Sequence, residues 1–250
     1  MPTPIQLLLD PMTLAASAVY LLLIVWEALV PARKLPVVRG WRIRAPFVFL
    51  AYLLISGYLP YLWADWVAPF RLFDLTNLPV WAGAAIGVVV YEAGAWLYHR
   101  SLHASNLLWR HLHQWHHSAE RLDTYGAFWF SPLDIAGWTA LSSLALTVVV
   151  GLSAQATFAA AIVITFLGIF QHTNVRTPRW LGYIIQRPES HSWHHARDFH
   201  ARNYFDLPLF DLLLGTFHNP EGFAPEQGFH SGASRRVLKT LRGSDLSRVS

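Results

Sequence analysis

Five apolar runs dominate this 250-residue sequence and restrict it to folds that cross a membrane. A helix needs about 20 mostly apolar residues to span the hydrocarbon core of a bilayer. Three runs approach or reach that length, at 13–30, 46–66 and 78–98. Two shorter runs, at 135–150 and 155–170, are expected to cross as a tight hairpin or to dip into the membrane and return. The sequence therefore predicts an all-α integral membrane bundle with four to five spans.

The composition supports a membrane protein and removes several other classes. Hydrophobic residues make up 54% of the chain and charged residues only 14%, and the 12 tryptophans are typical of membrane–water boundaries. Cysteine is absent, so disulfides, thiolate zinc sites and cysteine-ligated iron–sulfur clusters are excluded. The net charge of +4 comes with basic residues that flank apolar runs, which favours a membrane surface over nucleic acid as their partner.

The distribution of basic residues predicts how the bundle is oriented. The first loop, 31–44, carries five basic residues, whereas the second loop, 65–77, carries one basic and two acidic residues. Positive loops stay in the cytoplasm, so the N-terminus is expected outside and the first loop inside. The later spans then bring every histidine-rich segment to the cytoplasmic side, of either a bacterial inner membrane or the endoplasmic reticulum. There they would form a histidine-rich metal-binding cap.

The chain is expected to be one domain that is divided into three regions along the sequence. Residues 1–77 supply N-terminal transmembrane helices, 78–219 carry the histidines, and 220–250 form a basic tail. We expect the tail to be solvated near anionic headgroups. Two short apolar segments, 181–185 and 207–217, are expected to lie at the membrane interface rather than to cross it.

Histidines recur in three boxes after the third apolar run. They are His99 and His103, then His113, His116 and His117, and finally His191, His194 and His195. Positions i, i+3 and i+4 share one face of a helix, so each box is expected to aim its imidazoles at one point. A lone histidine on an apolar face is usually a core residue. Eight of them in three such boxes indicate metal binding instead, because imidazole is the commonest nitrogen ligand for metals.

The number of histidines also indicates how many metal ions they hold. A catalytic zinc usually takes three protein ligands and a water, so eight imidazoles exceed the needs of one zinc ion but suit a dinuclear site. Without thiolates, the candidates are iron, manganese or catalytic zinc. Iron beside a membrane suggests dioxygen chemistry on a lipid C–H bond. Two alternatives stay open: a di-metal zinc lipid hydrolase, although no HExxH motif is present, and a non-enzymatic metal or haem carrier.

Four segments resemble the fatty acid hydroxylase (sterol desaturase) superfamily over about residues 88–216. They are HRSLH (99–103), LLWRHLHQWHHSAERLD (107–123), QHTN (171–174) and RPESHSWHHARDFHARNYFDLPLFDLLLGT (187–216). The resemblance implies a membrane non-haem di-iron enzyme that uses O2 and external electrons to hydroxylate or desaturate a fatty acyl, sterol or ether lipid. It implies that the eight box histidines and His172 are the iron ligands, with zinc able to replace iron in recombinant protein.

The resemblance also implies a partner. Because no electron-transfer domain is visible in the sequence, we expect a separate donor that is cytochrome b5-, ferredoxin- or flavin-reductase-like. The other partner would be the lipid substrate, drawn sideways from the bilayer.

Several polar residues outside the boxes are candidates for supporting roles. Glu92 lies seven residues before His99 inside the third run, so it is expected to orient a ligand imidazole, or else to bond a neighbouring helix. His200 is expected at the rim of the site, as a ligand or a proton donor. The segment that resembles the family's C-terminal pattern also carries polar residues. Three of them are expected to support the metals: Asp198, Asn203 and Asp211.

Other polar residues near the boxes are expected to play no part in metal binding. His111 is two residues before His113, so its side chain would point away from the box face. His218 and His230 are expected to be exposed in the tail. Glu120 and Asp123 are expected to cap and solvate a turn.

Overall fold

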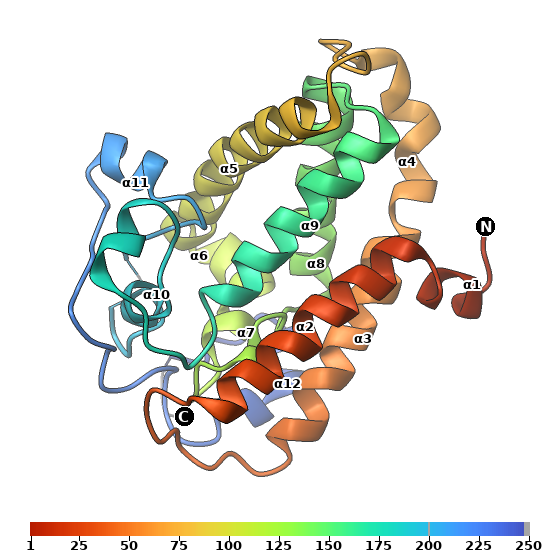
Figure 1. Cartoon of the computed structure of the whole chain (residues 1–250). Helices are drawn as coiled ribbons and strands as arrows, with labels where there is room; N and C mark the ends of the chain where they lie inside the picture. Colours follow the sequence, from red (N-terminus) through yellow and green to blue (C-terminus); the bar gives the residue numbers. More distant parts are fainter. Residues whose placement is uncertain (200, 248–250) are drawn as a thin grey trace.

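The computed structural model describes residues 1–199 and 201–247 and is built from helices (Figure 1). The α-helices are α1 (Pro4–Leu8), α2 (Pro11–Leu29), α3 (Trp41–Tyr58), α4 (Pro60–Val67), α5 (Val80–Ala104), α6 (Asn106–Leu108), α7 (Gln114–His117), α8 (Pro132–Ser142), α9 (Ala154–Phe170), α10 (Pro188–His194), α11 (Leu209–Leu214) and α12 (Val237–Leu241). Short 3-10 or π-helical turns are η1 (Ala68–Phe70), η2 (Trp109–His113), η3 (Thr124–Gly126), η4 (Ser143–Val149), η5 (Arg179–Tyr183) and η6 (Ala233–Arg235). Within the described residues, β-pairing is confined to one bridge between Ala196 and Gln227.

Four helical segments are long and apolar enough to cross a membrane. They are Pro11–Leu29, Trp41–Phe70, Val80–Ala104 and Pro132–Val149. The fifth apolar helix, α9, has 17 residues and is shorter than a typical span. The prediction of an all-α membrane bundle with four to five spans is therefore confirmed.

The second span begins five residues earlier than the sequence predicts. Helix α3 starts at Trp41, directly after Gly40, whose φ of 72° is a left-handed conformation that glycine adopts without strain. The Trp41 side chain is buried, and its indole Nε1 donates to Asp123 Oδ1 at 3.0 Å. A contact made 82 residues away therefore moves the start of this helix, which local hydropathy cannot reveal.

Side-chain caps mark where three of the apolar helices begin. Asp10, Ser131 and Ser153 each accept a hydrogen bond from the backbone N–H two or three residues ahead. Proline follows the first two caps as the first residue of the helix. The backbone N–H of that residue has no partner within the helix, so its absence in proline removes no hydrogen bond.

Small residues let α5 and α9 pack closely near their N-terminal ends (Figure 1). Gly83 and Gly87 of α5 face Ala156 and Ala160 of α9, and a Cβ added at Gly83 would lie 3.1 Å from the Ala156 Cβ. Close backbone approach of this kind is typical of helix contacts in membranes. The two helices run in the same direction from this contact and diverge towards their C-terminal ends, where α5 carries His99 and His103 and α9 leads into His172 (Figure 1).

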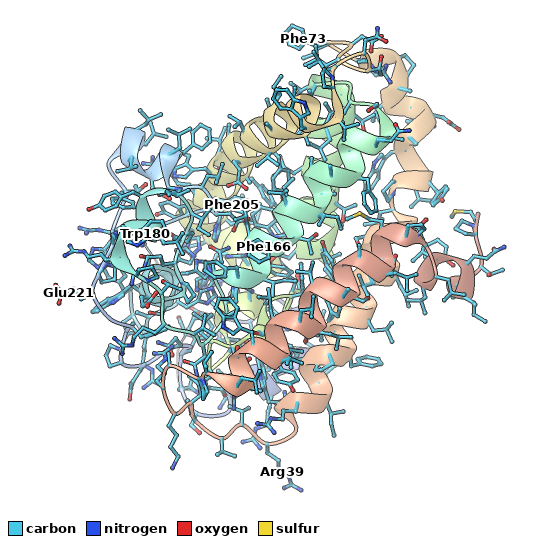
Figure 2. All side chains as sticks on the ribbon, viewed as in Figure 1. Arg39, Phe73, Phe166, Trp180, Phe205 and Glu221 are labelled. Atoms are coloured by element: carbon cyan, nitrogen blue, oxygen red, sulfur yellow. The ribbon has the colours of Figure 1, made fainter. Side chains whose placement is uncertain are left out.

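The short helices after α5 gather at one end of the bundle. Figure 1 shows α7 and α10 on the side of the bundle where α9 ends, and α12 contacts α7. The loop after α2 joins this end, because the backbone N–H of Ala32 donates to the Asn174 carbonyl at 2.7 Å. Figure 2 shows Phe73, in the loop after α4, far from Arg39, which lies in the basic loop near this cap. The structure therefore confirms a histidine-rich cap at one end. The two segments expected at the interface carry exposed apolar side chains, including Tyr183, Ile184 and Leu213.

The expectation of a solvated tail is wrong for residues 220–247. Phe229, Ala233 and Leu246 are buried in one cluster, and Trp109 packs against it. Leu246 N donates to Gln114 Oε1 at 3.2 Å, so the tail is tied directly to the second histidine box. Composition indicated a basic tail, but these apolar side chains find their partners only in the folded cap.

Glu120 and Asp123 are also buried rather than solvated. Asp123 does cap a turn, because its Oδ1 accepts from Gly126 N at 3.1 Å, but it binds the Trp41 indole as well. Glu120 Oε1 accepts from Ser234 N at 3.3 Å. These two carboxylates join the second histidine box to the first loop and to the tail.

Candidate metal centre

The nine histidines expected as ligands gather into two groups in the cap. The five-histidine group contains His99, His103, His113, His117 and His194, and the four-histidine group contains His116, His172, His191 and His195. Within each group the candidate ligand atoms all lie within 4.8 Å of one another. All nine side chains are buried except that of His103, which is half-buried.

The structure confirms that the first box aims at one point, because His99 and His103 share a group, and corrects this expectation for the two HxxHH boxes. In the second box, His113 and His117 enter the five-histidine group, whereas His116 enters the four-histidine group. The third box is divided in the same way, with His194 apart from its i and i+4 neighbours. Consecutive helical residues point about 100° apart, whereas i and i+4 differ by only about 40°. The two adjacent histidines of each HxxHH box therefore point into different groups. Each of these boxes contributes imidazoles to both groups.

Four of the imidazoles have an acceptor at Nδ1. The acceptors are Asp134 Oδ2 for His113 (2.9 Å), the Arg202 carbonyl for His194 (2.8 Å), the Gly168 carbonyl for His172 (2.7 Å) and the Tyr204 carbonyl for His99. An acceptor at Nδ1 fixes the proton there and leaves the Nε2 lone pair directed into the group. Three of these four belong to the five-histidine group.

The Nε2 atoms of these imidazoles converge on one another and on the Nε2 of His116. The His99 Nε2 lies 2.8 Å from that of His113 and 3.2 Å from that of His194, and the His172 Nε2 lies 3.0 Å from that of His116. In the contacts of His99 with His113 and with His194, both rings have their Nδ1 proton bonded elsewhere, so the two Nε2 lone pairs face each other and repel unless a cation lies among them. Separations near 3 Å are also those of neighbouring nitrogen ligands on one ion with bonds of about 2.0–2.1 Å. The donor set therefore fits two metal ions, one for each group.

The imidazoles of the four-histidine group lie outside the membrane-spanning segments, and burial keeps them in the neutral form that binds metals. It lowers the pKa of His172 to about 4, although the Gly168 carbonyl opposes the shift. Burial, followed by repulsion from neighbouring imidazoles, also holds the pKa of His116, His191 and His195 well below the ordinary value. No proton has to leave these four rings near neutral pH before a metal binds.

Asp134 is a site residue that the sequence analysis missed. It is fully buried at the start of α8, and its Oδ2 contacts His113 Nδ1. A signal was available, because Ser131 and Asp134 have the spacing of a helix capping box, which places the carboxylate in the first turn of the helix. Its ligand partner lies 21 residues away, however, and local pattern does not reveal that contact.

We expect Asp134→Ala to lower metal affinity about 10- to 100-fold, because residues that orient a ligand imidazole have effects of this size. Titration of the metal-depleted protein with Fe(II) would measure the affinity. Asp134→Asn keeps an acceptor for His113 Nδ1 and should lose less than the alanine variant. Equal metal affinity in all three proteins would contradict this role.

Two of the residues expected to support the metal ligands, Glu92 and Asp211, act through the segment around Tyr204. Glu92 is fully buried, but its Oε2 accepts from the backbone N–H of Leu207 at 2.8 Å rather than from an imidazole. It holds the segment whose Tyr204 carbonyl accepts from His99. Asp211 Oδ1 accepts from Trp96 Nε1 at 3.0 Å and from Tyr204 N at 3.2 Å, so it positions the same segment.

Of the remaining candidates around the third box, Asn203 is buried and hydrogen-bonded, whereas Asp198 is exposed. Asn203 Nδ2 donates to the His218 carbonyl at 2.8 Å and to the Ser190 carbonyl at 3.2 Å, which fixes the loop that follows α10. Asp198 is exposed, a position that does not suit support of a buried ligand. His200 lies outside the described residues.

Three histidines expected outside the metal site do lie apart from both groups. His111 is exposed and is a member of neither group, as expected. His218 and His230 also belong to neither, but they are half-buried rather than exposed, because the tail folds onto the cap.

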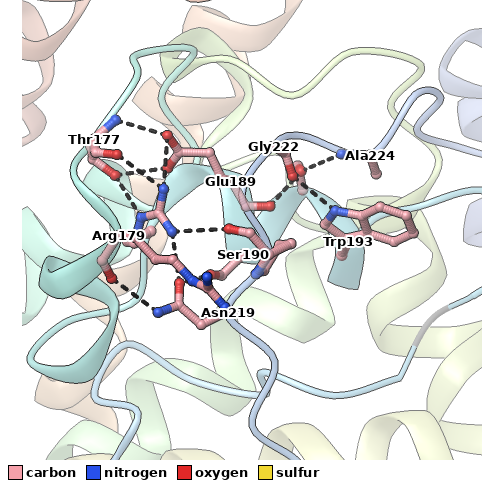
Figure 3. Close-up of polar contacts among 11 residues, drawn as sticks. Thr177, Arg179, Glu189, Ser190, Trp193, Asn219, Gly222 and Ala224 are labelled. Atoms are coloured by element: carbon pink, nitrogen blue, oxygen red, sulfur yellow. Dashed lines mark hydrogen bonds and ion pairs between the residues drawn. The ribbon is translucent and has the colours of Figure 1, made fainter.

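A buried ion pair anchors the helix that carries the third box (Figure 3). Arg187, just before α10, lies 3.2 Å from Glu189 Oε1 and donates from Nε to Thr177 Oγ1 at 2.9 Å and from Nη1 to Asn219 Oδ1 at 2.7 Å. Thr177 N donates in turn to Glu189 Oε1 at 2.8 Å. No local pattern reveals this network, because Arg187 bonds Thr177 before the box and Asn219 after it.

Comparison with known proteins identifies the family. Residues 84–216 match the fatty acid hydroxylase family, which covers all nine histidines. The chain belongs to this family. Among its relatives is the ornithine lipid hydroxylase OlsE of Rhizobium tropici, 35% identical over 140 residues, which cover 54% of this chain and 41% of that protein. Another is the alkylglycerol monooxygenase of Danio rerio, 30% identical over 189 residues, which cover 71% of this chain and 39% of that protein.

These alignments of the fatty acid hydroxylase chain span about two fifths of the length of the two relatives. No solved structure matches this chain significantly.

Proposed function

We propose that this fatty acid hydroxylase family member is a membrane oxidoreductase that hydroxylates or desaturates a lipid C–H bond with O2 and external electrons. The observation that carries the proposal is the pair of buried imidazole groups. Two bound irons would supply the activation of dioxygen, and the nine histidines would hold them. The names of the two relatives, a lipid hydroxylase and a monooxygenase, support this class of reaction.

A cavity of about 360 Å³ supports a lipid as the substrate. It is lined by His99, His113 and His116 at one end and by Phe130 and Trp138 beside them. A site of this size and apolar character suits the chain of a lipid better than a polar solute. The aromatic walls would orient the chain against the histidines and exclude water from the reacting carbon.

We propose that the cap faces the cytoplasm, in either a bacterial inner membrane or the endoplasmic reticulum. The basic first loop lies at the histidine end, where Arg33 Nη1 donates to the Ala224 carbonyl at 2.6 Å and Arg44 Nη1 donates to the Ser234 carbonyl at 2.9 Å. A separate donor that is cytochrome b5-, ferredoxin- or flavin-reductase-like would then supply electrons from that side.

Metal analysis combined with oxygen dependence tests the proposed function. We expect about two irons per chain, one for each imidazole group, and a Mössbauer spectrum of a coupled pair from protein grown on iron-57. Lipid oxidation should require both O2 and a reductant. Two zinc ions without iron, in protein from iron-replete cells purified anaerobically, together with lipid hydrolysis in the absence of O2, would favour the zinc hydrolase instead. A haem Soret band would favour the carrier.

A further inference from the structure

Two cavities inside the bundle share part of their walls. The cavity of about 360 Å³ that touches the histidines and a second one of about 390 Å³ are both lined by Met12, Tyr52, Ser56, Pro60 and Thr165. These five residues come from α2, α3, α4 and α9, so the shared wall surrounds the space between these helices. The second cavity therefore extends the first one away from the histidines.

Together the two cavities extend through most of the membrane-spanning region. Thr157, which lines the first cavity, lies about 20 Å along α9 from Phe170 at the histidine end. Met12, which lines both, lies about 25 Å along α2 from Leu29, the end of the helix that is held at the cap. The hydrocarbon core of a bilayer is about 30 Å thick, so the joint space reaches from the cap toward the opposite face.

The lining favours an alkyl chain over a polar ligand. Ser56 Oγ donates to the Tyr52 carbonyl at 2.6 Å and Thr139 Oγ1 donates to the Ile135 carbonyl at 2.7 Å, so these hydroxyls are already bonded to their own helices. Among the described residues, neither cavity is lined by lysine or arginine that would bind a phosphate headgroup. The first cavity is lined mainly by apolar surface, with Gln171 and Asp206 at its histidine end, and Gln6 and Asp10 add polar groups to the second.

The second cavity ends beside α1, at the end of the bundle opposite the cap. Leu7 of α1 packs against Gly57 of α3, and the Tyr58 hydroxyl donates to the Pro2 carbonyl at 3.0 Å, which fixes α1 at this edge. The exposed side chains of Gln6 and Asp10 line the cavity here. The polar residues mark the end of the apolar lumen.

We propose that the two cavities form one channel that holds a single alkyl or acyl chain of the lipid substrate, from the histidine groups to the edge beside α1. This inference rests on the proposed function, because it places the lipid substrate. The length of the channel then limits the length of the chain that reaches the histidines. A bulky side chain at the shared wall would shorten the channel without touching a histidine.

Thr165→Trp tests the channel, with Val163→Trp as the matched control on the same helix. Thr165 lines both cavities, whereas Val163 is 43% exposed on the outside of the bundle. For short- and long-chain homologues of one lipid, we expect Thr165→Trp to lower the turnover of the long chain relative to the short one by about tenfold or more. Metal content should stay unchanged, and the control should keep the unmodified preference. An equal loss for both chains, or the same shift in the control, would overturn the channel.

Photolabelling of the unmodified protein tests the same channel without relying on turnover or on a variant that folds. A fatty acid with a diazirine along its chain is irradiated with the protein in lipid nanodiscs, and labelled peptides are mapped by mass spectrometry. We expect labels on residues that line the two cavities, such as Ser56 and Thr165. Labels confined to exposed positions such as Val163 would overturn the inference. Labelled channel residues in a protein that oxidises no lipid would instead count against the proposed function alone.

Discussion

His194→Ala and His116→Ala are each expected to lower lipid oxidation by more than about 100-fold. The reason is that loss of a ligand should exceed the 10- to 100-fold effect of losing a residue that only orients one. The two histidines belong to different groups, and each has a buried Nε2 directed at its neighbours. Each variant should therefore also lose about half of the bound metal, because one group keeps its full set of ligands.

Product formation with O2 and a reductant, together with metal content per chain, measures both effects. His111→Ala is the control, because His111 lies in the same segment but is exposed and belongs to neither group. It should keep its metal and its activity. If His194→Ala or His116→Ala retained full metal loading and turnover, the assignment of ligands to these two groups would be wrong.

Arg187→Ala is expected to destabilise the protein by about 3–5 kcal/mol, the usual effect of removing one partner from a buried ion pair. The Arg187 side chain is 1% exposed, and its loss would leave the fully buried Glu189 without its cation. Because Glu189 lies in the first turn of α10, the metal content of the four-histidine group should fall as well. Unfolding in detergent, followed by circular dichroism, measures the free energy change.

Two further variants separate this buried pair from an ordinary surface pair. Arg179→Ala removes a partner from the exposed pair with Glu221, where the arginine is 58% exposed, and should cost at most about 1 kcal/mol. Replacing both members of the buried pair, as Arg187→Met with Glu189→Leu, should cost less than Arg187→Ala alone, because no charge stays buried without a partner. Equal stability of Arg187→Ala and the unmodified protein would show that the pair does not anchor α10.

The sequence alone determined the fold class and which histidines gather together. Apolar runs predict spans because a helix in lipid must satisfy its own backbone, and this requirement is local. The spacing of the three boxes likewise indicates a cluster of imidazoles, because positions i and i+4 adjoin on any helix. Both predictions need only the residues of one segment, and the structure places the nine histidines together at one end of the bundle.

Only the tertiary structure decided how the histidines are divided and what supports them. His113 meets Asp134 across 21 residues, His99 meets His194 across 95, and Arg44 reaches Ser234 across 190. The buried tail and the Arg187 pair also depend on contacts between segments far apart in the chain. Helical periodicity reports which face of a helix is buried, but not which other segment covers it. Such contacts form only when the spans pack, so no local pattern carries them.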